Sequence, residues 1–90
     1  MNTRELLISK LQTELSYQEY VRTSKWWLNH IDRLSSEFGF LKIGTKIEAS
    51  IYDEVQICEV RGFIINNGMS PSILVETDLG NVYYYDTKKV

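Results

Sequence analysis

The spacing of apolar residues changes near Gly39, from a helical period to the alternation of strands. Before the change, apolar residues recur every three or four positions, as one face of a helix requires. These residues are Leu7, Leu11, Leu15, Trp27, Ile31, Leu34 and Phe38. After the change, apolar and polar residues alternate, which places one set of side chains under a sheet and the other in water. The first alternating set is Ile47, Ala49 and Ile51.

Two residue pairs have the spacing of a capping box, in which a small polar residue is followed three positions later by a glutamate. The pairs are Asn2 with Glu5 and Ser16 with Glu19, and Ser24 is a third candidate for a helix start. The first helix is therefore expected to begin at Asn2 or Thr3. One bent helix and two joined helices are both compatible with this segment, because no glycine or proline interrupts it.

Gly39 is expected to end the helical part in the left-handed conformation, with Phe40 folding back towards Leu34. Four strands in a meander are expected to follow, at Lys46–Tyr52, Val55–Asn66, Ser72–Thr77 and Asn81–Asp86. Gly80 is expected to supply a positive φ in the tight turn before the last strand.

Along the second strand, the apolar residues expected to point into the core change from odd-numbered to even-numbered positions. Val55 and Ile57 have one parity, whereas the other parity is shared by Cys58, Val60, Gly62 and Ile64. A bulge near Ile57 or a bend at Gly62 would reconcile the two. The sheet side of the core is expected to contain Ile47, Ile51, Val60, Ile64 and Val75, with Leu34 and Phe38 on the helical side.

The chain is expected to form one α+β domain, residues 1–90. The helical part (residues 1–39, one bent or two joined helices) would pack on a small antiparallel four- or five-stranded barrel or sheet (residues 44–90) and share one core with it. A length of 90 residues, 43% of them hydrophobic, suits one core and is too small for a large enzyme with a deep cleft.

Charge and cysteine content exclude several classes of function. Ten basic and 12 acidic residues give a net charge of −2, which argues against a strongly basic nucleic-acid binder. Cys58 is the only cysteine, so no disulfide or thiol-based zinc site forms within the chain. The charged start lacks the apolar core of a signal peptide, and no apolar run reaches the length of a membrane span. A cytoplasmic protein without membrane contact is expected.

No group of residues predicts catalysis. His30 is the only histidine and has no partner cluster, so we interpret it as an ordinary helix residue. Cys58 lies in the apolar phase of a strand and is interpreted as a buried small side chain. The acids Asp53, Glu54 and Asp86 fit strand ends and turns, and the scattered glycines form no phosphate loop. We therefore expect no enzyme activity, no cofactor and no metal.

Adjacent aromatic residues give the strongest indication of a binding surface. Because neighbours in a helix or strand cannot share one face, Trp26-Trp27 and Tyr83-Tyr84-Tyr85 must each split between two faces. If Val82 and Tyr84 face inward, Tyr83 and Tyr85 face outward. The expected binding residues are Trp26, Trp27, Tyr83, Tyr85 and Arg61. An alternative is that the helical part covers the tyrosines within the same molecule.

The second half of the chain resembles an SH3-like small barrel of the KOW type. The resemblance is carried by Ile43-Gly44-Thr45, Val60-Arg61-Gly62-Phe63-Ile64, Ile73-Leu74-Val75-Glu76-Thr77 and Gly80-Asn81-Val82-Tyr83-Tyr84. It implies binding of proline-rich peptides, RNA, DNA or protein surfaces. This sequence departs from a nucleic-acid-binding barrel, because the sheet half contains five basic and seven acidic residues and so has no excess of positive charge.

The function expected from these observations is a non-catalytic protein-interaction module. A narrower form is a small phage-type or mobile-element protein that inhibits a larger host or defence complex by occupying its surface. The alternative is a nucleic-acid-associated barrel that stacks bases on its aromatics and contacts phosphates through Arg22, Lys25, Arg33 and Arg61. The oligomeric state is left open by the sequence.

Overall fold

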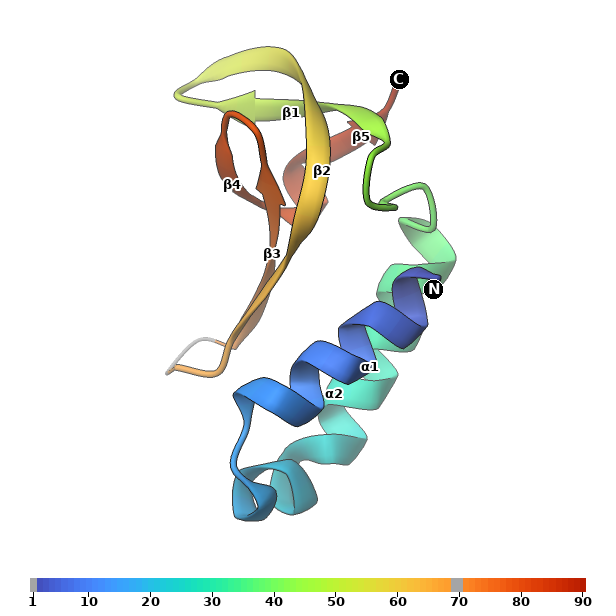
Figure 1. The fold of residues 1–90 in the computed structure, drawn as a ribbon, viewed down its shortest axis with the longest axis vertical. Coiled ribbons are helices and arrows are strands. Elements are labelled where there is room, and N and C mark those ends of the chain that lie inside the picture. The colour runs from blue at the N-terminus through green and yellow to red at the C-terminus, as the bar shows by residue number, and fades with distance from the viewer. Residues whose placement is uncertain (1, 69–70) are drawn as a thin grey trace. The chain divides into compact units, whose positions relative to one another are not determined.

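The fold is α+β, as expected: two helices precede a five-stranded antiparallel sheet (Figure 1). The structure is a computed structural model that describes residues 2–68 and 71–90. The chain divides into two compact units, Met1–Gly39 and Phe40–Val90, here termed the helical unit and the sheet unit. That the two units share one core stays a prediction.

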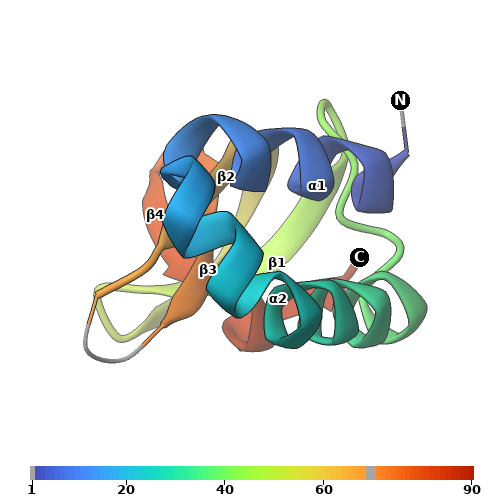
Figure 2. The ribbon, with the colours of Figure 1, turned by 90° about the horizontal axis from the view of Figure 1, so that it is seen from below.

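The helical unit is a hairpin of two helices, α1 (Thr3–Glu14) and α2 (Tyr17–Glu37), which lie side by side (Figures 1 and 2). Arg4 near the start of α1 forms an ion pair of 2.6 Å with Asp32 in the second half of α2. The start of α1 therefore lies beside the last part of α2, so the two helices run antiparallel.

Both predicted capping boxes start helices. The Asn2 side chain accepts a hydrogen bond from the Glu5 backbone N–H at 2.8 Å. The Ser16 hydroxyl accepts one from the Glu19 N–H at 3.2 Å. Extended backbone at Leu15 separates α1 from α2, so the segment forms two joined helices. The third candidate start, Ser24, lies inside α2 and starts no helix.

The predicted helical periodicity matches burial in this unit. Its buried apolar side chains are Leu7, Leu11, Leu15, Trp27, Ile31 and Leu34. Phe38 is only half-buried, although the spacing placed it on the same face. It follows α2 as the C-cap with φ −122° and ψ 34°, so it no longer keeps the helical direction of the residues before it.

The predicted left-handed cap at Gly39 is wrong. Among the described glycines, positive φ values occur at Gly44 (88°) and Gly80 (144°) and not at Gly39. The helix instead ends with the Phe38 N–H bonded to the Leu34 carbonyl at 2.6 Å. A Cβ at Gly39 would lie 2.9 Å from the Ser35 carbonyl oxygen. Glycine is therefore required here by a close approach of backbone rather than by its own φ.

The sheet unit has the strand order β4-β3-β2-β1-β5. Its elements are β1 (Lys46–Ile51), β2 (Glu54–Asn66), β3 (Ser72–Thr77), β4 (Gly80–Tyr83), the 3₁₀ turn η1 (Tyr84–Asp86) and β5 (Thr87–Lys89). The first four strands form the expected meander. The fourth ends at Tyr83, earlier than predicted, and β5 makes the sheet five-stranded, one of the two expected sizes, at a position that the sequence pattern did not locate.

β2 is long and curved, and it pairs with β1 through its first half and with β3 through its second half (Figure 1). The β2–β3 register shifts between Val60 and Gly62, which makes Arg61 an extra residue in β2. Gly62 then pairs with Glu76 and faces the same side, since a Cβ at Gly62 would lie 3.1 Å from a Glu76 carboxylate oxygen. The sequence allowed a bulge near Ile57 or a bend at Gly62; the structure has a bulge beside Gly62 and regular β1–β2 pairing at Ile57.

The bulge reverses the parity predicted for the rest of β2. Cys58, Val60 and Gly62 are buried as expected, but beyond Gly62 the buried residues are Phe63 and Ile65. Ile64 is half-buried and faces the other side, so its assignment to the core is wrong. The remaining predicted core residues of the sheet are buried: Ile47, Ile51, Val60 and Val75.

Two tight turns fix the register of the meander. Tyr52 and Asp53 have φ values of 51° and 64°, as in a two-residue hairpin turn between β1 and β2. At the β3–β4 turn, the Thr77 hydroxyl donates to the Gly80 carbonyl at 2.6 Å and accepts from the N–H groups of Leu79 and Gly80. Gly80 has the positive φ predicted for it.

Candidate functional site

A row of apolar side chains crosses the outward side of β2, β3 and β4. The register pairs Ile64 with Leu74 and Leu74 with Tyr83. Ile64 and Leu74 are half-buried, and Tyr83 is 42% exposed. Side chains that are direct cross-strand partners lie on the same face of a sheet, so these three form one continuous strip.

Tyr85 extends this strip beyond the end of β4. Its ring stacks on that of Tyr83, with centroids 5.2 Å apart and planes 5° from parallel. The Tyr84 ring meets Tyr85 edge-on at 5.4 Å and is half-buried. Buried Val82 and exposed Tyr83 and Tyr85 lie as the sequence predicted. The chain achieves this although Tyr84 and Tyr85 have left the strand.

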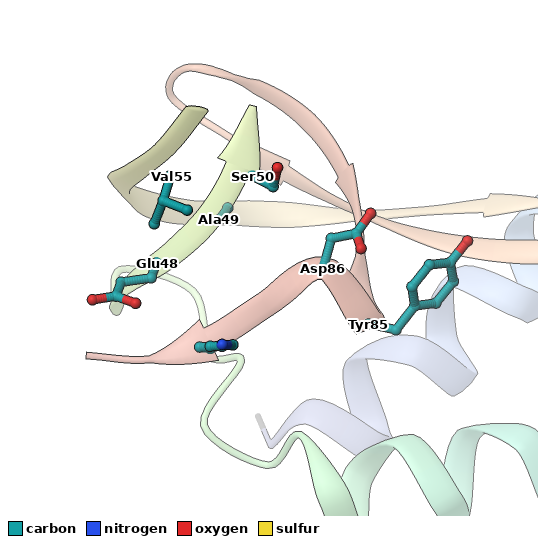
Figure 3. Close-up of a pocket in the computed structure, with 7 residues that line it drawn as sticks. Glu48, Ala49, Ser50, Val55, Tyr85 and Asp86 are labelled. Carbon is teal, nitrogen blue, oxygen red and sulfur yellow. The ribbon is translucent and has the colours of Figure 1, made fainter. Parts of the chain in front are cut away.

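Two hollows of about 280 Å³ each adjoin the tyrosines. The first is lined by Glu48, Ala49, Ser50, Val55, Tyr85, Asp86 and Lys88 (Figure 3). The second is lined by Ser50, Ile51, Tyr52, Leu74, Gly80, Asn81, Val82, Tyr83 and Asp86. Ser50 and Asp86 line both, so the hollows meet where β1 approaches η1. Residues of β1 and β4 also lie close together, although these strands are not neighbours in the sheet.

We define the outer aromatic surface as Val55, Leu74, Tyr83 and Tyr85, the apolar side chains that line the two hollows from the outward side. Val55 is 73% exposed and pairs with Ser50 across the β1–β2 hairpin. Tyr52 lines the second hollow from the turn of that hairpin and is 88% exposed. Tyr52 is not among the binding residues expected from the sequence, where it is a single aromatic residue at the end of the first expected strand.

Charged groups border the first hollow on two sides. Glu48 and Lys88 are cross-strand partners on β1 and β5, and Asp86 follows Tyr85 in η1. Partial desolvation raises the pKa of the Tyr85 hydroxyl, and Tyr83, Asp86 and Tyr84 raise it further. Tyr85 is therefore protonated at neutral pH and can donate a hydrogen bond at the edge of an apolar contact.

The other predicted binding residues, Trp26, Trp27 and Arg61, line neither of the two hollows. Trp26 is 50% exposed and Trp27 is fully buried, so the predicted split of the pair is confirmed. Trp27 belongs to the interior of the helical unit, and its predicted role as a contact residue does not fit that position. The Arg61 guanidinium forms an ion pair of 2.9 Å with Glu59.

His30 and Cys58 have the surroundings of structural residues. The His30 ring stacks on Trp26 at 5.1 Å, and burial lowers its pKa, which the charge of Arg33 lowers further. Cys58 is buried, and burial raises the pKa of its thiol, as does Asp78, whereas a hydrogen bond with the Thr77 side chain lowers it. A raised pKa keeps the thiol protonated and weakly nucleophilic at neutral pH.

Within residues 2–68 and 71–90, no group of three or more His, Cys, Asp or Glu side chains is placed to hold a metal ion. Neither α1 nor α2 combines the length and the apolar character that crossing a membrane requires. Comparisons with known proteins found no matching family model, no matching curated protein and no matching solved structure. The function must therefore be inferred from the chain's own residues.

Proposed function

We propose that the chain is a non-catalytic protein-interaction module that contacts its partner through the outer aromatic surface of the sheet unit. The observation that supports this most strongly is the stacked pair of Tyr83 and Tyr85, exposed by 42% and 57% beside two hollows. Tyrosine loses little conformational entropy on binding and offers both apolar area and a hydroxyl, which is why it is enriched at protein interfaces.

The shape of the surface also favours a protein partner. Val55 and Tyr85 line one hollow, and Leu74 and Tyr83 line the other, so a partner can insert side chains on both sides of the Ser50–Asp86 boundary. Acidic and basic residues at the edge of the surface would form its polar rim. Membership of the SH3-like barrels of KOW type is part of this proposal, and the short antiparallel strands around a curved β2 support it.

The narrower role is that of an inhibitor that occupies the surface of a larger complex. It also requires an exposed contact surface on the sheet unit. Such an inhibitor needs a preformed contact surface and no catalytic group. The alternative of a nucleic-acid-binding barrel is less well supported for the sheet unit, because Arg61 is the one expected phosphate contact that lies there, and it is paired with Glu59 at 2.9 Å.

Quantitative affinity capture from extracts of the source cell tests the proposal. The tagged full chain should enrich a partner that the Tyr83→Ala/Tyr85→Ala variant loses by roughly 30-fold, as expected for a hot-spot loss of about 2 kcal/mol. Tyr17→Ala is the matched control, because Tyr17 is 82% exposed on the helical unit. It should retain the partner.

Thermal unfolding of each variant checks that the fold persists. Because Tyr83 and Tyr85 are exposed, their replacement should change stability only slightly. A partner that binds the folded double variant as well as the wild type, and that is lost from Tyr17→Ala, would refute the proposed surface.

A further inference from the structure

The helical unit contains five basic side chains, which fall into two groups. Arg4 and Lys10 are paired with Asp32 and Glu14, at 2.6 Å and 4.0 Å. The other three are Arg22, Lys25 and Arg33, all exposed and all on α2. No ion pair joins these three to an acidic side chain in the described part of the chain.

The three unpaired cations lie along one face of α2. At about 100° of rotation per residue, they fall within an arc of about 80° around the helix axis. Arg22 and Arg33 are separated by about 16 Å along that axis, at about 1.5 Å per residue. The acids of α2 are Glu19, Asp32 and Glu37, so none lies between positions 19 and 32. Asp32 is already engaged by Arg4.

A half-exposed aromatic ring lies on the same face. Trp26 is 50% exposed, and its position falls within about 40° of Arg22 around the helix. Its ring stacks on His30 with the planes 11° from parallel, which holds the indole in place. Because the pKa of His30 is lowered from 6.5 by burial and by Arg33, the imidazole behind the indole is uncharged at neutral pH.

We propose that this basic face, defined as Arg22, Lys25, Trp26 and Arg33, binds single-stranded nucleic acid. The three cations would contact successive phosphates along about 16 Å of helix, and Trp26 would stack on an unpaired base. Cations that form no ion pair within the described residues, combined with a half-exposed aromatic ring, match the chemistry of phosphates and bases together. An acidic protein surface could also use the cations, and the test below compares the two kinds of ligand.

The site is independent of the outer aromatic surface and belongs to the other unit. Its affinity should lie in the range of non-specific binding, about 10⁻⁴ to 10⁻⁶ M at physiological salt, because it offers only three phosphate contacts. The overall charge of −2 limits long-range attraction between the chain and nucleic acid, so binding depends on the local contacts of this face.

Fluorescence anisotropy of labelled oligothymidylate, titrated with the full chain between about 50 and 200 mM salt, tests the proposal. With three phosphate contacts, the slope of log K against log salt should be about −2, at about −0.7 per contact on a single strand. Arg22→Ala should make the slope shallower by about 0.7. Trp26→Ala should weaken binding by roughly 5- to 150-fold while leaving the slope unchanged.

Lys10→Ala is the matched control, since it removes a cation of the same unit that is paired with Glu14. It should retain both affinity and slope. Tyr83→Ala/Tyr85→Ala should also bind oligothymidylate normally, which separates this site from the proposed partner surface.

Several outcomes would overturn the proposal. Binding without salt dependence would exclude the phosphate contacts. If Lys10→Ala lost as much affinity for oligothymidylate as Arg22→Ala, the loss would be explained by net charge and not by the basic face. Binding of poly-glutamate with the same slope and the same sensitivity to Trp26→Ala would assign the face to an acidic protein. Absence of binding at about 50 mM salt, in a chain shown to be folded, would exclude nucleic acid.

Discussion

Tyr83 and Tyr85 lie with their rings parallel within 5° and 5.2 Å apart, although Tyr84 separates them in the chain. In a regular strand, alternate side chains on one face are separated by about 6.5 to 7 Å. Here β4 ends at Tyr83 and the 3₁₀ turn η1 begins at Tyr84, which shortens the distance. The Thr87 hydroxyl closes the turn by donating to the Tyr84 carbonyl at 2.6 Å. The aromatic pair therefore depends on a local interruption of the strand.

Val60→Ala should destabilise the protein by roughly 1–3 kcal/mol, because Val60 is fully buried and its removal leaves a cavity. Val55→Ala in the same strand is the control and should change stability by less than about 0.5 kcal/mol, since Val55 is 73% exposed. Urea unfolding measures both. Equal effects at the two positions would contradict the assigned faces of β2.

Ser16→Ala should reduce the free energy of unfolding by about 1 kcal/mol. Its hydroxyl accepts a hydrogen bond from the Glu19 N–H at the start of α2, and alanine leaves that N–H without its cap. Ser36→Ala, an exposed position in the last turn of the same helix, should have little effect. Circular dichroism during urea unfolding compares them, and a larger loss at Ser36 would be inconsistent with the cap.

Thr77→Val should destabilise the β3–β4 turn by roughly 1–3 kcal/mol, because it deletes a hydroxyl that makes three hydrogen bonds without changing the side-chain shape. Thr77→Ser keeps the hydroxyl and should retain most of the stability. Thermal unfolding distinguishes the two variants. If valine and serine were equally tolerated, the hydroxyl would not hold the turn.

Lowering the pH should destabilise the chain through His30. Burial lowers the pKa of His30 from 6.5, and Arg33 lowers it further, so the unfolded chain takes up a proton more readily than the folded one. Stability is then fully present above the unfolded pKa and falls as the pH decreases from about 7 to about 5. His30→Gln should make the unfolding free energy less dependent on pH over this range. Parallel pH profiles for the two proteins would contradict the shift.

The features that the sequence predicted correctly are those set by neighbouring residues. The Asn2 and Ser16 caps act within three positions of each helix start, and the Trp26-Trp27 split follows from helical geometry alone. The outward tyrosines followed from strand alternation up to Tyr83. In each case the deciding contact lies within a few residues along the chain.

The features that the sequence missed depend on contacts between distant segments. β5 consists of three polar residues, and it exists because it pairs with β1 about 40 positions earlier. Gly39 is an exception, because its close approach is to the carbonyl of Ser35 only four positions earlier, and the sequence pattern does not distinguish that approach from a left-handed cap. Tyr52 became a site residue only when β1 and β4 were brought close together.

The extra residue at Arg61 marks the place where β2 can lose a residue without exchanging its two faces. Deleting Arg61 would leave one residue between Val60 and Phe63, opposite the single residue between their partners Thr77 and Val75, which is regular pairing. Phe63 and Ile65 would keep their partners on β3 and therefore their inward side. Deleting Ile64 would instead move Ile65 to the position opposite Leu74 and turn it outward. β2 should therefore accept the loss of one residue at the bulge more readily than the loss of one residue beyond it.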